Sequence, residues 1–136
     1  MASYHLQIVT PDGPRFDGQA EKLIVRASEG DVCILARHIN YVTALGMGVA
    51  RITIDGQVRR AACIGGMLSV HNGEVKLVAS AFEWAEDIDL DRARRAGDIA
   101  GEKLSHRDQM SQLEIAQAEA ALKRALVRQS AAGGAV

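Results

Sequence analysis

Apolar and polar residues alternate along the first part of the chain with the period of β-strands. Tyr4, Leu6 and Ile8 alternate with His5 and Gln7, and the turn-forming run Pro11-Asp12-Gly13-Pro14 ends this first segment. Short apolar segments follow at 19–27, 32–35, 41–45, 49–54, 57–64, 67–70 and 75–80. They are too short for helices, and turn residues separate them. This pattern predicts about eight to ten short strands in a sandwich or flattened barrel.

Two tight hairpins are predicted within this region. Asp55-Gly56 separates two of the apolar segments, and His71-Asn72-Gly73 separates two others. Asp-Gly and Asn-Gly supply the positive φ values that such turns require. Gly65-Gly66 lies between two strands rather than before a helix, which favours a β-bulge or a close sheet contact over a phosphate-binding loop.

The pattern changes after Trp84. Residues 85–136 are rich in Ala, Leu, Arg and Glu, and they contain no proline. Asp89 is expected to cap a helix that runs to about Leu104, since acidic residues are favourable at the positive end of a helix. The apolar face of this helix consists mainly of small residues, and Gly97 and Gly101 predict close packing on a neighbouring helix.

A second helix is predicted from about His106 to Gln129, with Ser105-His106-Arg107-Asp108 as its capping box. Its narrow apolar stripe consists of Ile115, Ala118, Leu122 and Leu126. The two helices should form an antiparallel hairpin. Its basic end, with Lys123, Arg124 and Arg128, suits either the helix dipole or an acidic or phosphate-bearing partner.

The chain therefore divides into residues 1–84, a β-sandwich, and residues 85–136, a helical hairpin with a flexible tail from about 130, so the fold class is α+β. Nine of the 13 glycines, both prolines and all five aromatic residues occur no later than Trp84. Because the hairpin has little apolar area, we expect its docking to contribute only a few kcal/mol, about what a few buried side chains supply. A detached state is then reachable, with a hinge at about 83–89.

Charge and composition exclude several classes of function. A formal net charge of -1 gives no reason to expect nucleic acid as a partner. The sequence has no apolar run of the roughly 18 residues that span a bilayer and no signal peptide, which predicts a cytosolic protein that reaches a membrane only through partners. The four histidines are scattered, so a metal site is not expected, and Cys33 and Cys63 are expected to be reduced core thiols.

No pattern predicts an enzyme. The serines lack the context of a nucleophile elbow, and the acidic residues around 83–91 are typical of a solvated helix start. The segment 88–95 combines acidic groups with three arginines, so it could bind a nucleotide or could simply form a charged helix face.

The order of these elements resembles the epsilon subunit of bacterial F-type ATP synthases, a ten-stranded β-sandwich followed by a helical hairpin. The resemblance covers nearly the whole chain. It rests on the segments His5–Gly13, Ser28-Glu29-Gly30, His38, Thr43-Ala44-Leu45, Gly65–Val70 and Ala85–Asp89.

The resemblance implies a non-catalytic rotor subunit that couples proton flow to ATP synthesis at the cytoplasmic face of the inner membrane. Its implied partners are the gamma subunit, the c ring and, transiently, the alpha/beta catalytic head, where the extended hairpin would inhibit ATP hydrolysis. No cofactor is required, and ATP is the implied regulatory ligand. The segment Ile88-Asp89-Leu90-Asp91-Arg92-Ala93 is similar to the Ile-Asp-x-x-Arg-Ala motif with which some relatives bind ATP. The implied ATP contacts are Glu83, Ile88, Asp89, Arg92, Ala93, Arg124 and Arg128.

The implied contacts with gamma and the c ring are Glu29, Asp31 and His38. Asp31 matches an acidic position that faces the c ring, and His38 matches one that faces gamma. The segment Leu35–Asn40 departs from the family pattern Leu-Pro-Gly-His-Ala-Pro, which predicts a less rigid loop, and Gly46-Met47-Gly48 replaces a Pro-Gly turn. The alternative function is a free-standing binding module or nucleotide sensor with a helical oligomerisation tail.

Overall fold

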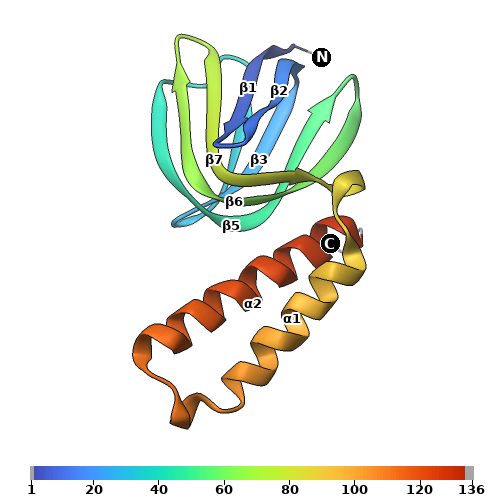
Figure 1. Cartoon of the computed structure of the whole chain (residues 1–136). Helices are drawn as coiled ribbons and strands as arrows, with labels where there is room; N and C mark the ends of the chain where they lie inside the picture. The colour runs from blue at the N-terminus through green and yellow to red at the C-terminus, as the bar shows by residue number, and fades with distance from the viewer. Residues whose placement is uncertain (1, 134–136) are drawn as a thin grey trace.

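Seven strands form one continuous sheet in the computed structural model, which describes residues 2–133. The sheet curls on itself into a sandwich, and a helical hairpin lies beneath it (Figure 1). The strands lie in the order β2-β1-β7-β6-β5-β3-β4, and only the β1–β7 pair is parallel. Their bounds are β1 Tyr4–Thr10, β2 Gly13–Ala20, β3 Lys22–Ala27, β4 Gly30–Leu35, β5 Tyr41–Ile54, β6 Gln57–His71 and β7 Glu74–Trp84.

The predicted fold class is confirmed, although the number of strands is seven rather than about ten. Four of the predicted segments join pairwise into the long strands β5 and β6, because glycines at the joints bend these strands without ending the ladder. Leu45 pairs with Gly66 on one side of the bend, and Met47 pairs with Ile64 on the other. The predicted strand 19–27 is divided at Glu21 between β2 and β3.

Gly66 shows why a glycine is required at this bend. Its φ is 122°, and a Cβ atom placed there would lie 2.0 Å from the carbonyl oxygen of Val78 on β7. Gly65-Gly66 is therefore the close sheet contact that its position predicts. The two hairpin turns are also confirmed, with positive φ at Asp55, Gly56, Asn72 and Gly73.

The hydrophobic core lies entirely within the sandwich. All members of its buried cluster lie between Tyr4 and Trp84, and Leu6, Leu68 and Phe82 are among its fully buried side chains. The Tyr4 hydroxyl donates to the Ile34 carbonyl at 2.9 Å, which ties β1 to β4 across the core. Burial raises the pKa of Tyr4, so the hydroxyl remains protonated.

Cys63 is a buried core thiol, and burial raises its pKa to about 12. The same prediction was wrong for Cys33, which is exposed. Cys33 lies on β4, the last strand in the sheet order, where Ile34 faces the core and its two neighbours face outward. A short apolar run on an edge strand thus buries only alternate residues.

Two helices follow a 3-10 turn at Ala85–Asp87. They are α1 Leu90–Leu104 and α2 Gln112–Ala132, and they pack side by side (Figure 1). Asp89 caps α1 as predicted, since its Oδ1 accepts the Arg92 backbone N–H at 3.0 Å. None of the helices within residues 2–133 is long and apolar enough to cross a membrane.

The predicted start of the second helix was wrong. Ser105 does not cap it, because the Ser105 N–H and hydroxyl bond to carbonyls of the preceding helix and complete α1. A 3-10 turn at Arg107–Gln109 follows, and the capping box is formed by Ser111 and Glu114. Two Ser-x-x-acid segments therefore compete, and the one with Glu at its end caps the helix.

The far end of α2 also differs from the prediction. The helix continues to Ala132, so it includes the start of the tail predicted from about residue 130, and residues 134–136 lie outside the described residues. Its buried side chains are Ala118, Ala125 and Ala131, whereas Leu126 is exposed. Small side chains thus form the packed face of α2. Ala118 belongs to the predicted stripe, whereas Ala125 is buried in place of the predicted Leu126.

Candidate functional site

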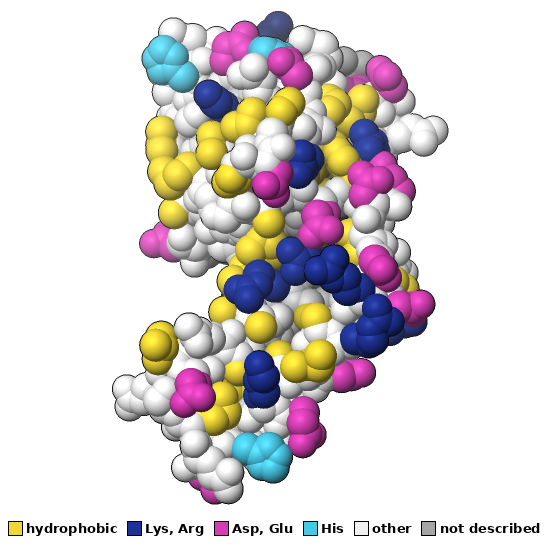
Figure 2. All heavy atoms as spheres, viewed as in Figure 1, with side chains coloured by type: hydrophobic (Ala, Val, Ile, Leu, Met, Phe, Trp, Pro, Cys, Tyr) yellow, Lys and Arg dark blue, Asp and Glu magenta, His cyan; other side chains and the backbone are white. Residues whose placement is uncertain are grey.

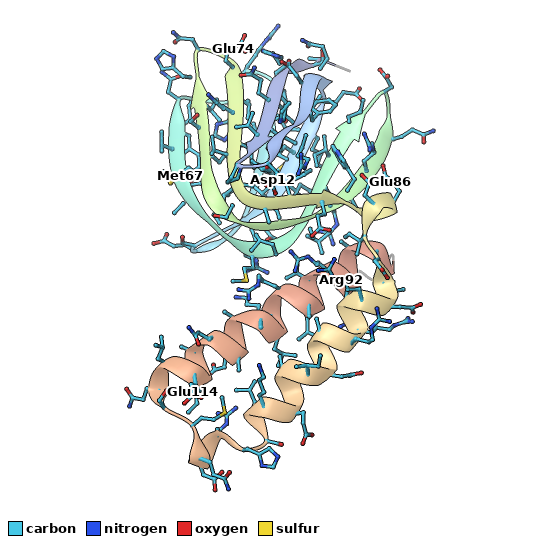
Figure 3. All side chains as sticks on the ribbon, in the orientation of Figure 1. Asp12, Met67, Glu74, Glu86, Arg92 and Glu114 are labelled. Atoms are coloured by element: carbon cyan, nitrogen blue, oxygen red, sulfur yellow. The ribbon has the colours of Figure 1, made fainter. Side chains whose placement is uncertain are left out.

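A cavity of about 420 Å³ lies where the hairpin meets the end of β7. The start of α1, the second half of α2 and the segment between β7 and α1 form its walls. Figure 3 places Arg92 at the start of α1, below the turn that carries Glu86. The cavity is lined by Glu83, Asp87, Ile88, Asp89, Arg92, Ala93, Ala96, Ala121, Arg124, Ala125 and Arg128.

All seven residues named as ATP contacts in the sequence analysis line this one cavity. Glu83 comes from β7, Arg92 and Ala93 come from the first turn of α1, and Arg124 and Arg128 come from α2. The arginines of α2 lie more than thirty residues from Arg92 in the sequence, so the fold of the hairpin brings the set together.

The start of α1 supplies a locally positive wall. The first backbone N–H groups of a helix have no partner within the helix, and the helix dipole adds partial positive charge there. Asp89 Oδ1 occupies one of these donors, the Arg92 N–H, at 3.0 Å. Arg92 itself is exposed, so its guanidinium is accessible to a ligand.

Arg128 and Glu83 form an ion pair at the cavity. The Arg128 Nε donates to Glu83 Oε1 at 2.5 Å, and their side chains are 29% and 39% exposed. Nearby, Arg60 Nη2 on β6 donates to the Ser130 carbonyl at 3.0 Å. These two contacts join the end of α2 to the sandwich.

Arg59 contacts the end of β7 and the segment that joins it to α1. Its guanidinium carbon lies 3.7 Å from the centre of the Trp84 ring, and its Nη2 pairs with the Glu86 carboxylate. A hydrogen bond from its own backbone N–H, followed by the contact with Arg59, lowers the pKa of Glu86. Figure 2 shows the Lys and Arg side chains gathered along the junction between sandwich and hairpin.

The composition of the cavity suits the binding of an anion that also carries an apolar group. Three arginines and three acidic residues line it, and Ile88 with the alanines of both helices provides an apolar wall. Guanidinium groups bind phosphate oxygens through paired hydrogen bonds. Arginines beside an apolar wall are features of a binding site for such a ligand.

Sequence reasoning missed four lining residues, namely Asp87, Ala96, Ala121 and Ala125. Three of them could have been found from helical spacing, because Ala96 lies four residues after Arg92, and Ala121 and Ala125 lie three residues before Arg124 and Arg128. No local signal indicates the contacts of Arg59 and Arg60, since they arise from the tertiary fold.

The residues predicted to contact gamma and the c ring do not gather at one site. Glu29 lies in the turn between β3 and β4, and Asp31, at the start of β4, pairs with Arg26 at 3.2 Å. His38 lies beyond the other end of β4, in the loop that leads to β5, and its Nδ1 lies 2.8 Å from the Ile39 carbonyl. The prediction thus places two contact regions at opposite ends of this strand.

Gly48 has a local packing role beside Arg26, the partner of Asp31. A Cβ atom on Gly48 would lie 2.6 Å from the Arg26 Cβ. Glycine therefore leaves room for the Arg26 side chain that pairs with Asp31. In the described residues, no group of three or more His, Cys, Asp or Glu side chains is arranged to hold a metal ion.

Two family models together match nearly the whole chain. Residues 3–85 match "ATP synthase, Delta/Epsilon chain, beta-sandwich domain", and residues 86–133 match "ATP synthase, Delta/Epsilon chain, long alpha-helix domain". An ATP synthase epsilon chain of Bacillus velezensis is 42% identical over 133 residues, which cover 98% of this chain and 99% of that protein. One of Caldanaerobacter subterraneus is 40% identical over 127 residues, which cover 93% and 91% of the two chains.

Solved structures show the same fold. A chain in the cryo-EM structure of the Euglena gracilis mitochondrial ATP synthase, OSCP/F1/c-ring in rotational state 1, aligns with a TM-score of 0.82 at 22% identity, covering 96% of this chain and 82% of that chain. A chain of the Tetrahymena thermophila mitochondrial ATP synthase central stalk and c ring aligns with a TM-score of 0.66 at 15% identity, covering 94% and 95%.

Proposed function

Since this chain belongs to the ATP synthase delta/epsilon chain family, we propose that it is a non-catalytic rotor subunit whose hairpin responds to ATP. In this role it binds the gamma subunit and the c ring, and it is peripheral to the membrane, at its cytoplasmic face. The observation that carries the ATP response is the single cavity lined by all seven expected ATP contacts.

An outward-facing apolar stripe on the sandwich supports a protein partner for this domain. Val9, Val78, Met67 and Ala44 are consecutive cross-strand neighbours on β1, β7, β6 and β5. Met67 is 47% exposed and Val78 is 44% exposed, and Figure 3 shows Met67 on the outside of the sheet. An apolar stripe across four strands is the kind of surface that a protein partner covers. We assign it to gamma.

The proposed ATP site fits a nucleoside triphosphate in size and chemistry. Its volume of about 420 Å³ lies within the range of small-molecule sites. Arg92, Arg124 and Arg128 would bind phosphate oxygens, and Ile88 with the neighbouring alanines would contact the base. Because Arg124 and Arg128 lie on α2 and Arg92 lies on α1, the complete site exists only while the two helices are packed together.

ATP then stabilises the folded hairpin, and its loss favours the extended, inhibitory form. A ligand shifts such an equilibrium only by its difference in affinity for the two forms, and a change from 1:99 to 99:1 needs about ten-thousandfold preference. Weak ATP binding would therefore bias the hairpin rather than switch it completely.

Truncation after Glu86 in the assembled enzyme tests the inhibitory role. We expect ATP hydrolysis to rise while the truncated chain still co-purifies with gamma and the c ring, because the apolar stripe and both predicted contact regions remain. Unchanged hydrolysis would rule out inhibition by the hairpin but not the rotor role. Failure of the full chain to co-purify with gamma would instead favour a free-standing binding module.

A further inference from the structure

The two helices of the hairpin are close together near the sandwich and open at their far ends. A Cβ atom on Gly97 would lie 2.9 Å from Gln129 Nε2 and 3.6 Å from the Ala125 Cβ, so α1 and α2 touch at this level. One turn further along α1, a Cβ on Gly101 would meet no atom within 4 Å. The close packing predicted for Gly101 was therefore wrong. A groove opens between the far halves of the two helices, and Ala100 lines it, whereas Gly101 does not.

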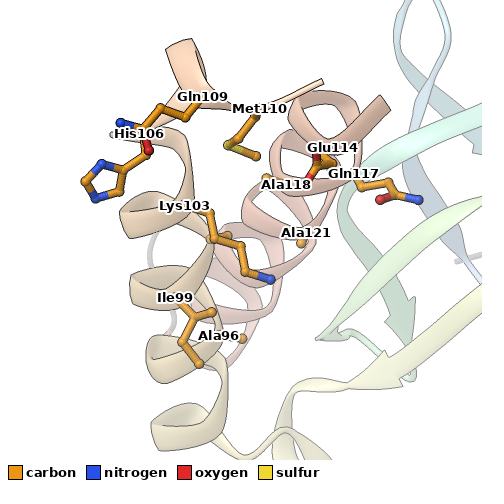
Figure 4. A pocket seen from close by; sticks show the side chains of 11 residues that line it. Ala96, Ile99, Lys103, His106, Gln109, Met110, Glu114, Gln117, Ala118 and Ala121 are labelled. Atoms are coloured by element: carbon orange, nitrogen blue, oxygen red, sulfur yellow. The ribbon is translucent and has the colours of Figure 1, made fainter. Parts of the chain in front are cut away.

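This groove has a volume of about 690 Å³, larger than the proposed ATP site. The far half of α1, the connecting turn and the first half of α2 form its walls (Figure 4). Its lining residues are Ala96, Ile99, Ala100, Lys103, His106, Gln109, Met110, Glu114, Gln117, Ala118 and Ala121. Only Ala96 and Ala121 are shared with the proposed ATP site.

The walls of the groove are mainly apolar. Ile99 is 59% exposed although it lines the groove, and Met110 from the connecting turn contributes a flexible thioether side chain. Alanine methyl groups of both helices complete the apolar part of the lining, and the remaining lining residues are polar or charged. An elongated apolar group between the helices would remove Ile99 and these methyl groups from water.

The groove has one lysine that an anionic head group can pair with, Lys103, and one carboxylate, Glu114. Figure 4 shows the Lys103 side chain extending from α1 across the groove toward α2. Lys103 takes part in none of the ion pairs or side-chain hydrogen bonds of residues 2–133. The one carboxylate in the lining, Glu114, already accepts the Ser111 backbone N–H at 3.0 Å in the capping box. His106 lies 3.2 Å from Glu102.

We propose that this groove binds a single-chain amphiphile with an anionic head group. Its acyl chain lies between α1 and α2 against Ile99, Met110 and the alanines, and its head group pairs with the Lys103 ammonium. The site does not depend on the proposed ATP response, because none of the three cavity arginines lines the groove.

Binding at this site also stabilises the paired arrangement of the helices. Both walls are needed to enclose an acyl chain, so the ligand binds the packed hairpin better than separated helices. By mass action it then favours the packed form in proportion to its concentration relative to its Kd.

Dodecanoate below its micellar concentration is the probe, and the test uses the full chain with its methionine methyl groups labelled with ¹³C. We expect saturable binding by calorimetry and a shift of the Met110 methyl resonance, with Met47 and Met67 in the sandwich unshifted. A dodecyltrimethylammonium titration should give weaker binding, because its head group repels Lys103. A single-chain lysophosphatidylglycerol distinguishes a lipid from a free fatty acid, and binding of either with these signatures supports the proposal.

Two variants locate the ligand. Lys103→Gln should weaken dodecanoate binding by roughly twofold to fivefold, as expected for a solvent-exposed ion pair. Lys123→Gln is the matched control, because it removes the same charge from an exposed position of α2 that does not line the groove. Ala121→Leu should fill the groove and abolish binding while circular dichroism shows unchanged helicity. Absence of saturable binding, an unshifted Met110 methyl or equal effects of the two lysine variants would overturn the proposal.

Discussion

Arg128, in the last two turns of α2, donates from its Nε to Glu83 Oε1 near the end of β7 at 2.5 Å. The pair spans the boundary between sandwich and hairpin, and both residues line the proposed ATP site. Arg128 thus contributes to docking of the hairpin and also lines the cavity in which an anionic ligand would bind.

Glu83→Gln should loosen the docked hairpin, because it removes the charge that pairs with Arg128. We expect a loss of up to about 1 kcal/mol of docking free energy, as for other partly exposed ion pairs. Faster limited proteolysis within 85–89 would report it. Glu119→Gln, an exposed change on α2, is the control. Equal cleavage rates in the two variants would mean that the ion pair does not hold the hairpin.

Ser111→Ala should destabilise α2 by about 1 kcal/mol, because it removes the N-cap hydroxyl that accepts the Glu114 N–H. Ser105→Ala should cost less, since the Ser105 hydroxyl bonds only to the Glu102 carbonyl at the end of α1. Helicity measured against urea concentration checks this order. The reverse order would restore the helix start that the sequence predicts at Ser105.

Gly66→Ala should destabilise the sandwich by roughly 2–4 kcal/mol, combining backbone strain with a steric clash against Val78. Gly13→Ala is the matched control, because Gly13 has a similar φ of 125° but a Cβ there would meet nothing within 4 Å. Chemical unfolding of the two variants separates the clash from the strain. Similar losses would show that the sheet relaxes around the added methyl group.

The stability of the sandwich should depend on pH through His5. Its two ring nitrogens lie 2.5 Å from Asp17 on β2 and 2.5 Å from Glu74 on β7. Hydrogen bonds with Asp17 and then Glu74 raise the pKa of His5, and the bond with His5 followed by that from Gln7 lowers the pKa of Asp17.

The two shifts define a window of stabilisation. The histidine contribution is complete below the ordinary pKa of 6.5 and is lost as pH rises through the raised value in the folded chain. The Asp17 contribution is complete above 3.8 and is lost as pH falls through its lowered value. Hence the unfolding midpoint should fall from pH 6 to pH 9, and His5→Gln should reduce that fall. An equal reduction in His71→Gln, an exposed position at the end of β6, would contradict this assignment.

The sequence predicts the fold class because alternation and turn residues are local signals, whereas the seven cavity residues are expected only from the family resemblance, since residues of α2 meet α1 only in the folded hairpin. Alternation identifies the strands, Asp-Gly and Asn-Gly identify two turns, and the Ile88–Ala93 motif identifies one wall of the cavity. The length of β5 and β6 is not predicted, because glycine often ends a strand, whereas Gly66 here bends one against Val78. Whether a glycine ends a strand or bends it depends on the neighbouring strand, here β7 with Val78.

The packing within the hairpin is the other part that sequence patterns do not determine. Gly97 and Gly101 lie one turn apart on α1, yet only a Cβ on Gly97 would contact α2. Likewise, the exposed Leu126 and the buried Ala125 are adjacent on α2, and the partner surface decides which one packs.

In the proposed function, ATP in the cavity holds the hairpin against the sandwich. Single-molecule energy transfer tests this between dyes on Cys33, which is exposed, and on Glu119→Cys in α2, since Cys63 is buried and unreactive. We predict that ATP increases the short-distance population in this chain and has no such effect when Arg92→Gln is added. A distance distribution unchanged by saturating ATP, or an equal response with Arg92→Gln, would show that ATP in this cavity does not hold the hairpin.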